Sequence, residues 1–165
     1  MIRVGLLSDT HGYLDPKIYT YFDEVDEIWH AGDVGSTDVI DELRAFKPTV
    51  GVYGNIDDHS VRLEFPEFQC FQREGVKILM THIGGKPGKY SKPAYAAILS
   101  EQPNLFICGH SHILLVKNDP VMRMLCMNPG ACGYKGFHQV KTLIRFAISD
   151  EKIHDLEVIE IGKRI

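Results

Sequence analysis

Five short strings of aspartate, asparagine and histidine stand out in this chain: D-T-H at 9–11, G-D at 32–33, G-N at 54–55, T-H at 81–82 and G-H-S-H at 109–112. Carboxylate oxygen combined with imidazole nitrogen suits divalent transition metals better than Ca²⁺ or Cu(I), because the set has neither an all-oxygen cage nor a thiolate. The strings therefore predict a metal site whose candidate ligands are Asp9, His11, Asp33, Asn55, His82, His110 and His112.

The spacing of these residues predicts two ions. Asp9 and His11 are two positions apart, as are His110 and His112. In an extended segment, side chains at this spacing point to the same side and can hold one ion. Asp33 is the natural bridge, since a shared carboxylate holds two ions about 3.5–4 Å apart, the separation of two-metal hydrolytic sites.

Such a centre predicts hydrolysis of an anionic substrate. The charges of two divalent ions exceed those of Asp9, Asp33 and a hydroxide between the ions, which leaves a surplus that a phosphoryl oxygen can neutralise. We expect that hydroxide to attack phosphorus in line, so that no side-chain nucleophile is required.

The first third of the chain predicts alternating strands and helices. Apolar runs at 2–8, 27–30 and 49–53 predict buried strands. Asp15-Pro16 predicts a helix start, and Ser36 or Thr37 opens a predicted helix that ends at residue 46 before Pro48. Three of the polar strings follow strand ends, which is where open α/β sheets build their sites.

The remainder of the chain is richer in strands. We predict strands at 76–81, 105–108, 113–117, 121–127, 142–148 and 153–159, and a helix at 93–101. A single sheet of so many strands would be wide for this length, so we expect two sheets packed face to face with helices outside.

Composition fits one globular domain over residues 1–165, with 44% hydrophobic and 24% charged residues. The formal charge of −4, without a lysine or arginine run, gives no support for a nucleic-acid partner. The apolar N-terminal stretch is too short and polar for a signal peptide or membrane span, and the four cysteines lack C-x-x-C spacing. We therefore expect reduced thiols, a cytoplasmic location and no membrane association.

The ordered set of strings resembles the calcineurin-like metallophosphoesterases over about residues 2–150, and Asn128-Pro129-Gly130 is similar to their small bacterial and archaeal phosphodiesterase branch. The resemblance implies a four-layer α/β/β/α sandwich with two packed mixed β-sheets and a metal-dependent phosphodiesterase acting on a phosphoester substrate. It implies Mn²⁺, with Zn²⁺, Fe²⁺, Ni²⁺ or Co²⁺ as alternatives. It also assigns Asp9, His11, Asp33 and His112 to one ion, and Asp33, Asn55, His82 and His110 to the other.

Two positions depart from the family pattern. Many members follow Gly-Asn with a histidine that protonates the leaving group, whereas this chain has Ile56. Isoleucine cannot donate a proton, which favours activated diesters over alkyl monoesters. His59 could lend a proton instead, and Asp57 could orient a ligand or simply form an Asx turn. Ile83-Gly84-Gly85 replaces the usual Gly-His, and the basic segment 84–90 could either close on a phosphate or form a plain solvent loop.

Three alternatives compete with the phosphodiesterase. Amidohydrolases also use H-x-H, but their barrel needs about 250 residues. A phosphomonoesterase and a catalytically weak or inactive metal-binding scaffold for protein–protein interaction stay open. All seven expected ligands are in place, which favours an enzyme over a scaffold. The sequence leaves the physiological substrate open, and relatives of this size suggest a possible homo-oligomer.

Overall fold

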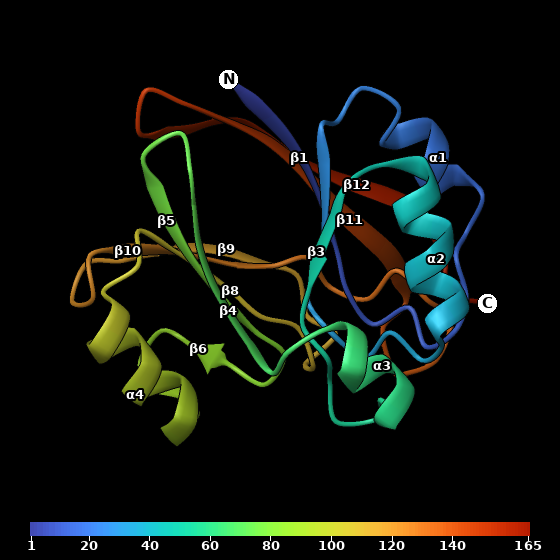
Figure 1. The fold of residues 1–165 in the computed structure, drawn as a ribbon, viewed down its shortest axis with the longest axis horizontal. Coiled ribbons are helices and arrows are strands. Elements are labelled where there is room, and N and C mark those ends of the chain that lie inside the picture. The colour runs from blue at the N-terminus through green and yellow to red at the C-terminus, as the bar shows by residue number, and fades with distance from the viewer.

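Two mixed β-sheets of five strands each lie face to face in the computed structural model, which describes residues 1–165 (Figure 1). The first sheet has the order β12-β11-β1-β2-β3, in which β1, β2 and β3 run parallel and β11 and β12 run antiparallel to their neighbours. Its strands are β1 (Ile2–Leu7), β2 (Glu27–His30), β3 (Thr49–Gly51), β11 (Val140–Ser149) and β12 (Lys152–Lys163).

The second sheet has the order β4-β5-β8-β10-β9, with a parallel centre and an antiparallel strand at each edge. Its strands are β4 (Phe68–Arg73), β5 (Val76–Thr81), β8 (Leu105–Ile107), β9 (Leu115–Asp119) and β10 (Met124–Asn128). A separate short hairpin joins β6 (Gly85–Lys86) to β7 (Lys89–Tyr90).

Helices cover the outer faces of both sheets. The helices α1 (Lys17–Tyr21), α2 (Thr37–Phe46) and α3 (His59–Glu64) lie on the side of the first sheet, and α4 (Lys92–Glu101) lies against the second (Figure 1). The predicted four-layer α/β/β/α sandwich is confirmed.

Three buried clusters hold the layers together. The inter-sheet cluster centres on Trp29, whose ring meets those of Phe71 and Phe146 edge to face at 5.0 and 5.6 Å between centroids. A second cluster packs α1 and α2 on the first sheet, and a third packs α4 on the second sheet. Burial on both faces explains why the central strands read as continuous apolar runs in the sequence.

Several elements agree with the sequence prediction and others differ for identifiable reasons. The strands at 27–30 and 76–81 and the helix at 37–46 are found with the predicted bounds, and Ser36 caps that helix by accepting from Asp38 N. The helix predicted after Pro16 lasts only from Lys17 to Tyr21. Neither α3, which has only six residues, nor the edge strand β4 was predicted from the sequence. Segment 84–90 forms the β6–β7 hairpin rather than a plain loop.

The four cysteines are free thiols, as expected, and three of them are buried. None of the helices has the length and apolar character needed to cross a membrane.

A buried ion pair fixes the start of α1 to the first sheet. Lys141 Nζ lies 2.6 Å from Asp15 Oδ2, while Asp15 Oδ1 accepts from Lys17 N at 2.9 Å. Burial opposes ionisation of Asp15, but the bonds from Lys141 and Lys17 hold its pKa below the ordinary value. The charge on Asp15 therefore stabilises the folded state.

We predict that Asp15→Asn, which keeps an acceptor for Lys17 N, lowers the free energy of unfolding by about 2 kcal/mol because Lys141 stays buried without its counter-charge. The difference from wild type should be full at neutral pH and should shrink as the pH falls below the ordinary carboxyl pKa of 3.8, toward the lower value of the folded state. Urea unfolding at several pH values measures it. Glu64→Gln, which breaks the exposed pair with Arg44, is the control and should cost less than about 0.5 kcal/mol.

Candidate metal centre

The loops that carry the predicted ligands leave the carboxyl ends of parallel strands in both sheets. In the first sheet, β1, β2 and β3 lead to Asp9, Asp33 and Asn55; in the second, β5 leads to His82 and β8 to His110 and His112. Parallel strands end at a common edge, so the two edges meet where the sheets pack together. All seven residues are gathered at this seam, as the sequence predicts.

The backbone around the ligands is not extended, contrary to the expectation for the D-x-H and H-x-H strings. Asp9 N, His11 N and Gly12 N bond to carbonyls of residues 32–34, so the first two loops run side by side beyond the sheet. Five of the seven residues adopt left-handed φ values between 47° and 69°: Asp9, His11, Asp33, His110 and His112. Non-glycine residues rarely adopt this conformation, and its concentration here marks a functional site.

Asp9 is fully buried and presents one oxygen to the centre. Its Oδ2 accepts from Ser8 Oγ at 2.7 Å and from His110 N at 3.3 Å. Its Oδ1 has no hydrogen-bond partner and lies 3.1 Å from His112 Nε2, 3.8 Å from His11 Nε2 and 3.7 Å from His82 Nε2. The local bonds therefore hold the carboxylate so that Oδ1 faces three imidazoles.

Asp33 is held in a similar way, with one oxygen facing histidines from both sheets. Its Oδ1 accepts from Ile56 N at 3.1 Å, and Oδ2 lies 3.5 Å from His11 Nε2 and 3.1 Å from His82 Nε2. Gly54 must lack a side chain, because a Cβ there would collide with Asp33 Oδ1 and N. The expected bridge thus presents one oxygen to the centre, not two.

The orientation of His82 leaves a lone pair pointing into the centre. Its Nδ1 lies 2.7 Å from the carbonyl oxygen of Ala31, which can only accept, so Nδ1 carries the proton. In the neutral ring, Nε2 is then an unprotonated nitrogen, and it has no hydrogen-bond partner. This is the usual arrangement of a metal-binding histidine fixed by a carbonyl behind it.

The donor atoms form two groups. Asp9, His11 and His112 offer one set of atoms within 4.8 Å of one another, and Asp33, His82 and His110 offer another. Each group contains three of the four residues that the family resemblance assigns to one ion. The seventh residue, Asn55, is exposed and places Oδ1 3.0 Å from His110 Nδ1, beside the second group.

The buried polar atoms that lack a partner indicate what this cluster holds. Four buried side-chain nitrogen or oxygen atoms have no hydrogen bond, and three of them are Asp9 Oδ1, His11 Nε2 and His82 Nε2. Buried polar groups rarely stay unpaired, and metal ligands about 2.1 Å from a common ion lie about 3 Å apart when their bonds are perpendicular. The separations described above are of this size, so the residues fit divalent ions.

The charges of the cluster point to the same conclusion. Burial opposes ionisation of Asp9, but the neighbouring His11, His112 and His82 imidazoles hold its pKa well below the ordinary range. Burial likewise opposes the charged form of His82, yet Asp33 and Asp9 raise its pKa above the ordinary value. The buried carboxylates therefore attract positive charge into the centre.

Asp57 and His59, the two weaker candidates of the sequence analysis, lie in different surroundings. Asp57 is buried, and its carboxylate accepts from Val34 N at 3.1 Å, Gly35 N at 2.7 Å and Gly54 N at 2.8 Å. These bonds join the loop of Asp33 to the loop of Asn55, which is a positioning role. His59 is exposed at the first residue of α3, and its proton donation stays a prediction.

His30 and Asn128 support the loops of the candidate ligands in roles that the sequence analysis did not predict. His30 is fully buried beneath the loops; its Nδ1 accepts from Gly32 N, and its Nε2 lies 2.9 Å from Thr10 Oγ1. Burial lowers its pKa to about 3, so it stays neutral. Asn128 Nδ2 donates to Gly109 O and Ser111 Oγ and so supports the G-H-S-H loop. His30 has no sequence signal beyond a polar residue at the end of a buried strand, whereas Asn128 stands in the Asn128-Pro129-Gly130 string.

The fold and this cluster define a protein of the metallohydrolase class. A family model for the calcineurin-like phosphoesterase superfamily domain matches residues 2–151, and the chain belongs to this superfamily. A probable metallophosphoesterase from Methanothermobacter thermautotrophicus is 27% identical over 164 residues, covering 96% of this chain and 92% of the relative. Membership supports a metal-dependent phosphoester hydrolase that binds divalent ions, and the archaeal relative agrees with the small branch indicated by the sequence.

Solved structures of the same fold extend the comparison. A structure described as a novel archaeal phosphodiesterase superposes with a TM-score of 0.75 at 25% identity, covering 96% of this chain and all of that one. Wild-type Vps29 from Entamoeba histolytica complexed with Zn²⁺ superposes with a TM-score of 0.73 at 16% identity, covering 98% and 99% of the two chains. The second likeness establishes the fold alone.

We predict that Asp57→Ala lowers the free energy of unfolding by about 3 kcal/mol, because three backbone N–H groups lose a charged acceptor. Metal affinity should fall as well, because the loops of Asp33 and Asn55 are no longer joined. Thermal unfolding and Mn²⁺ titration measure the two effects.

The matched control is the neighbouring Asp58→Ala. Asp58 caps α3 by accepting from Val61 N, so its loss should cost about 1 kcal/mol and leave Mn²⁺ affinity unchanged. Equal effects of both substitutions on metal binding would contradict the positioning role of Asp57.

Proposed function

We propose that this chain is a metal-dependent phosphodiesterase whose single domain, residues 1–165, holds a binuclear centre. The observation that carries the proposal is Asp33 Oδ2, which lies within 3.5 Å of both His11 Nε2 and His82 Nε2. These histidines belong to different donor groups, so one oxygen of Asp33 is placed to contact both ions. We propose Asp9, His11, Asp33 and His112 as ligands of one ion and Asp33, Asn55, His82 and His110 as ligands of the other.

Two bound divalent ions, with Mn²⁺ expected, would supply a hydroxide at neutral pH and stabilise the charge of an in-line displacement at phosphorus. The chain contributes the geometry. Ser8 and His110 N hold Asp9, Ile56 N holds Asp33, and Ala31 O holds His82, so the donors are oriented before any ion arrives. Such preorganisation lowers the reorganisation needed during the reaction.

The surroundings of Ile56 support a diester substrate. Its side chain is 45% exposed beside Asn55, at the position where a histidine would donate a proton in many relatives. No proton can come from this side chain, so a leaving group that departs as an anion is favoured over one that needs a proton at this position. Activated diesters meet this requirement, whereas alkyl monoesters do not.

A metal-binding scaffold is the second candidate function, favoured by the fold shared with Vps29. The unpaired atoms Asp9 Oδ1, His11 Nε2 and His82 Nε2 fit metal binding in either function. The presence of all seven expected ligand residues favours the enzyme. A phosphomonoesterase would use the same centre and is separated from the diesterase by its substrate preference.

We predict that Asp33→Ala abolishes hydrolysis and loses both ions together, because one carboxylate is shared between them. Elemental analysis of protein purified after Mn²⁺ loading measures the stoichiometry, and circular dichroism checks that the variant is folded. Asp23→Ala, at an exposed aspartate, is the control and should keep metal and activity. Full metal occupancy in folded Asp33→Ala would remove the bridge from the mechanism.

We also predict that the Mn²⁺-loaded protein cleaves bis(p-nitrophenyl) phosphate faster than p-nitrophenyl phosphate, with kcat/KM at least about tenfold higher, as the proposed preference for activated diesters requires. Both substrates release the same chromophore, so one absorbance assay compares them. Faster cleavage of the monoester would support the phosphomonoesterase instead.

A further inference from the structure

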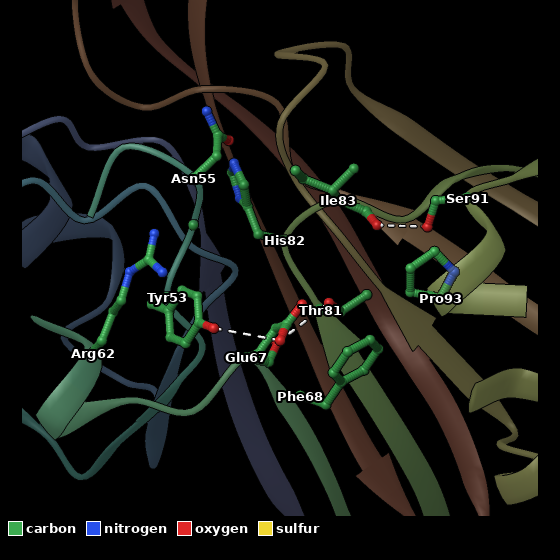
Figure 2. Close-up of a pocket in the computed structure, with 11 residues that line it drawn as sticks. Tyr53, Asn55, Arg62, Glu67, Phe68, Thr81, His82, Ile83, Ser91 and Pro93 are labelled. Carbon is green, nitrogen blue, oxygen red and sulfur yellow. Dashed lines mark hydrogen bonds between the residues drawn. The ribbon is translucent and has the colours of Figure 1, made fainter. Parts of the chain in front are cut away.

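A cavity of about 300 Å³ opens directly beside the metal centre (Figure 2). It lies between α3 and the start of α4, at the seam of the two sheets. Asn55 and His82 line the cavity and also belong to the proposed ligand set. A group attached to a phosphorus atom at the centre can therefore extend into this space without a conformational change.

One wall of the cavity is formed by the Arg62 guanidinium stacked on the Tyr53 ring. The guanidinium carbon of Arg62 lies 4.5 Å from the centroid of the Tyr53 ring, and Arg62 Nε donates to Asp57 O at 2.9 Å. Figure 2 shows the guanidinium over the Tyr53 ring on the α3 side of the cavity. The guanidinium is thus fixed by the same residue that joins the metal-binding loops.

Three apolar side chains, Phe68, Ile83 and Pro93, also line the cavity. Ile83 and Pro93 form the side opposite Arg62, and the Phe68 ring lies at the bottom (Figure 2). Ile83 is 45% exposed, although it directly follows the buried ligand His82. An exposed isoleucine at this point is explained if a ligand group covers it.

The hydroxyl groups around the cavity are already bonded within the protein. Tyr53 OH donates to Glu67 Oε2 at 3.3 Å, Thr81 Oγ1 donates to Glu67 O at 3.2 Å, and Ser91 Oγ donates to Ile83 O at 2.9 Å. The cavity therefore offers apolar and aromatic surfaces, one guanidinium and the Glu67 carboxylate, and these three hydroxyl groups already donate within the protein. Such surroundings recognise an aromatic ring, which stacks on arginine and packs against phenylalanine and isoleucine.

We infer that this cavity is a specificity subsite that binds an aromatic group carried on one ester arm of the substrate phosphodiester. The inference rests on the proposed function and adds the chemical class of the substrate. A volume of about 300 Å³ is at the lower end of the range for ligand pockets, so it suits a single ring system and not a longer chain of linked residues.

The test measures binding of three phosphonates to Mn²⁺-loaded protein by isothermal titration calorimetry: methylphosphonate, cyclohexylphosphonate and phenylphosphonate. All three place the same phosphonate at the metals and differ only in the single group available to the cavity. We expect phenylphosphonate to bind at least about tenfold more tightly than methylphosphonate, as burial of a ring implies, and more tightly than cyclohexylphosphonate.

Two substitutions in α4 test whether the difference in affinity between phenylphosphonate and methylphosphonate arises in this cavity. Pro93→Trp places a bulky side chain in the cavity and should bring the phenyl-to-methyl affinity ratio close to one, while methylphosphonate binding is unchanged. Leu99→Trp is the matched control, because Leu99 is 52% exposed on the same helix outside this cavity, and it should keep the wild-type ratio. Phe68→Ala, which widens the cavity, should also lower the ratio and gives a second variant if Pro93→Trp does not fold.

The outcomes separate this inference from the proposed function. Equal affinity for phenyl- and methylphosphonate, or for phenyl- and cyclohexylphosphonate, in a protein that hydrolyses diesters would overturn the aromatic subsite alone. Absence of both phosphonate binding and phosphoester hydrolysis would remove the proposed function and the subsite with it.

Discussion

The burial of two carboxylates beside four imidazoles is the constraint on which this structure depends. Asp9 is fully buried and Asp33 is 3% exposed, and each directs one oxygen toward histidine nitrogens. Buried charges are costly unless they are paired or coordinate a metal. A protonated histidine can balance part of the charge of these carboxylates, as the raised pKa of His82 indicates. Two divalent ions would balance it while the histidines stay neutral and the aspartates stay anionic.

The fold meets this constraint by bringing strand ends from two sheets to one seam. The inter-sheet cluster around Trp29 fixes the sheets against each other, and buried hydrogen bonds from His30, Asp57 and Asn128 then fix the loops. Left-handed backbone at several ligands costs about 1–3 kcal/mol each when nothing compensates. The hydrogen bonds between the loops keep these residues in place, and the proposed ions would add to this. The cavity beside His82 lies at the same seam, so the proposed metal ligands and the proposed specificity subsite are adjacent.

The sequence predicted the layers and the proximity of the candidate ligands, but not the local geometry. Long apolar runs such as 76–81 and a capped helix such as 37–46 are readable because their signals are local. The convergence of Asp9 and His11 was expected from period-two spacing in an extended segment, whereas both residues are left-handed, a conformation set by bonds to the neighbouring loop. The roles of His30 and Asp57 and the Arg62 wall depend on contacts between distant segments, which a single sequence does not encode in its spacing.

Anomalous diffraction at the manganese edge, from crystals grown with Mn²⁺, tests the central claim most directly. The account predicts two peaks per chain about 3.5–4 Å apart, one bounded by Asp9, His11 and His112 and the other by His82 and His110, with Asp33 between them. A single peak, or none at full Mn²⁺ saturation, would contradict the binuclear centre.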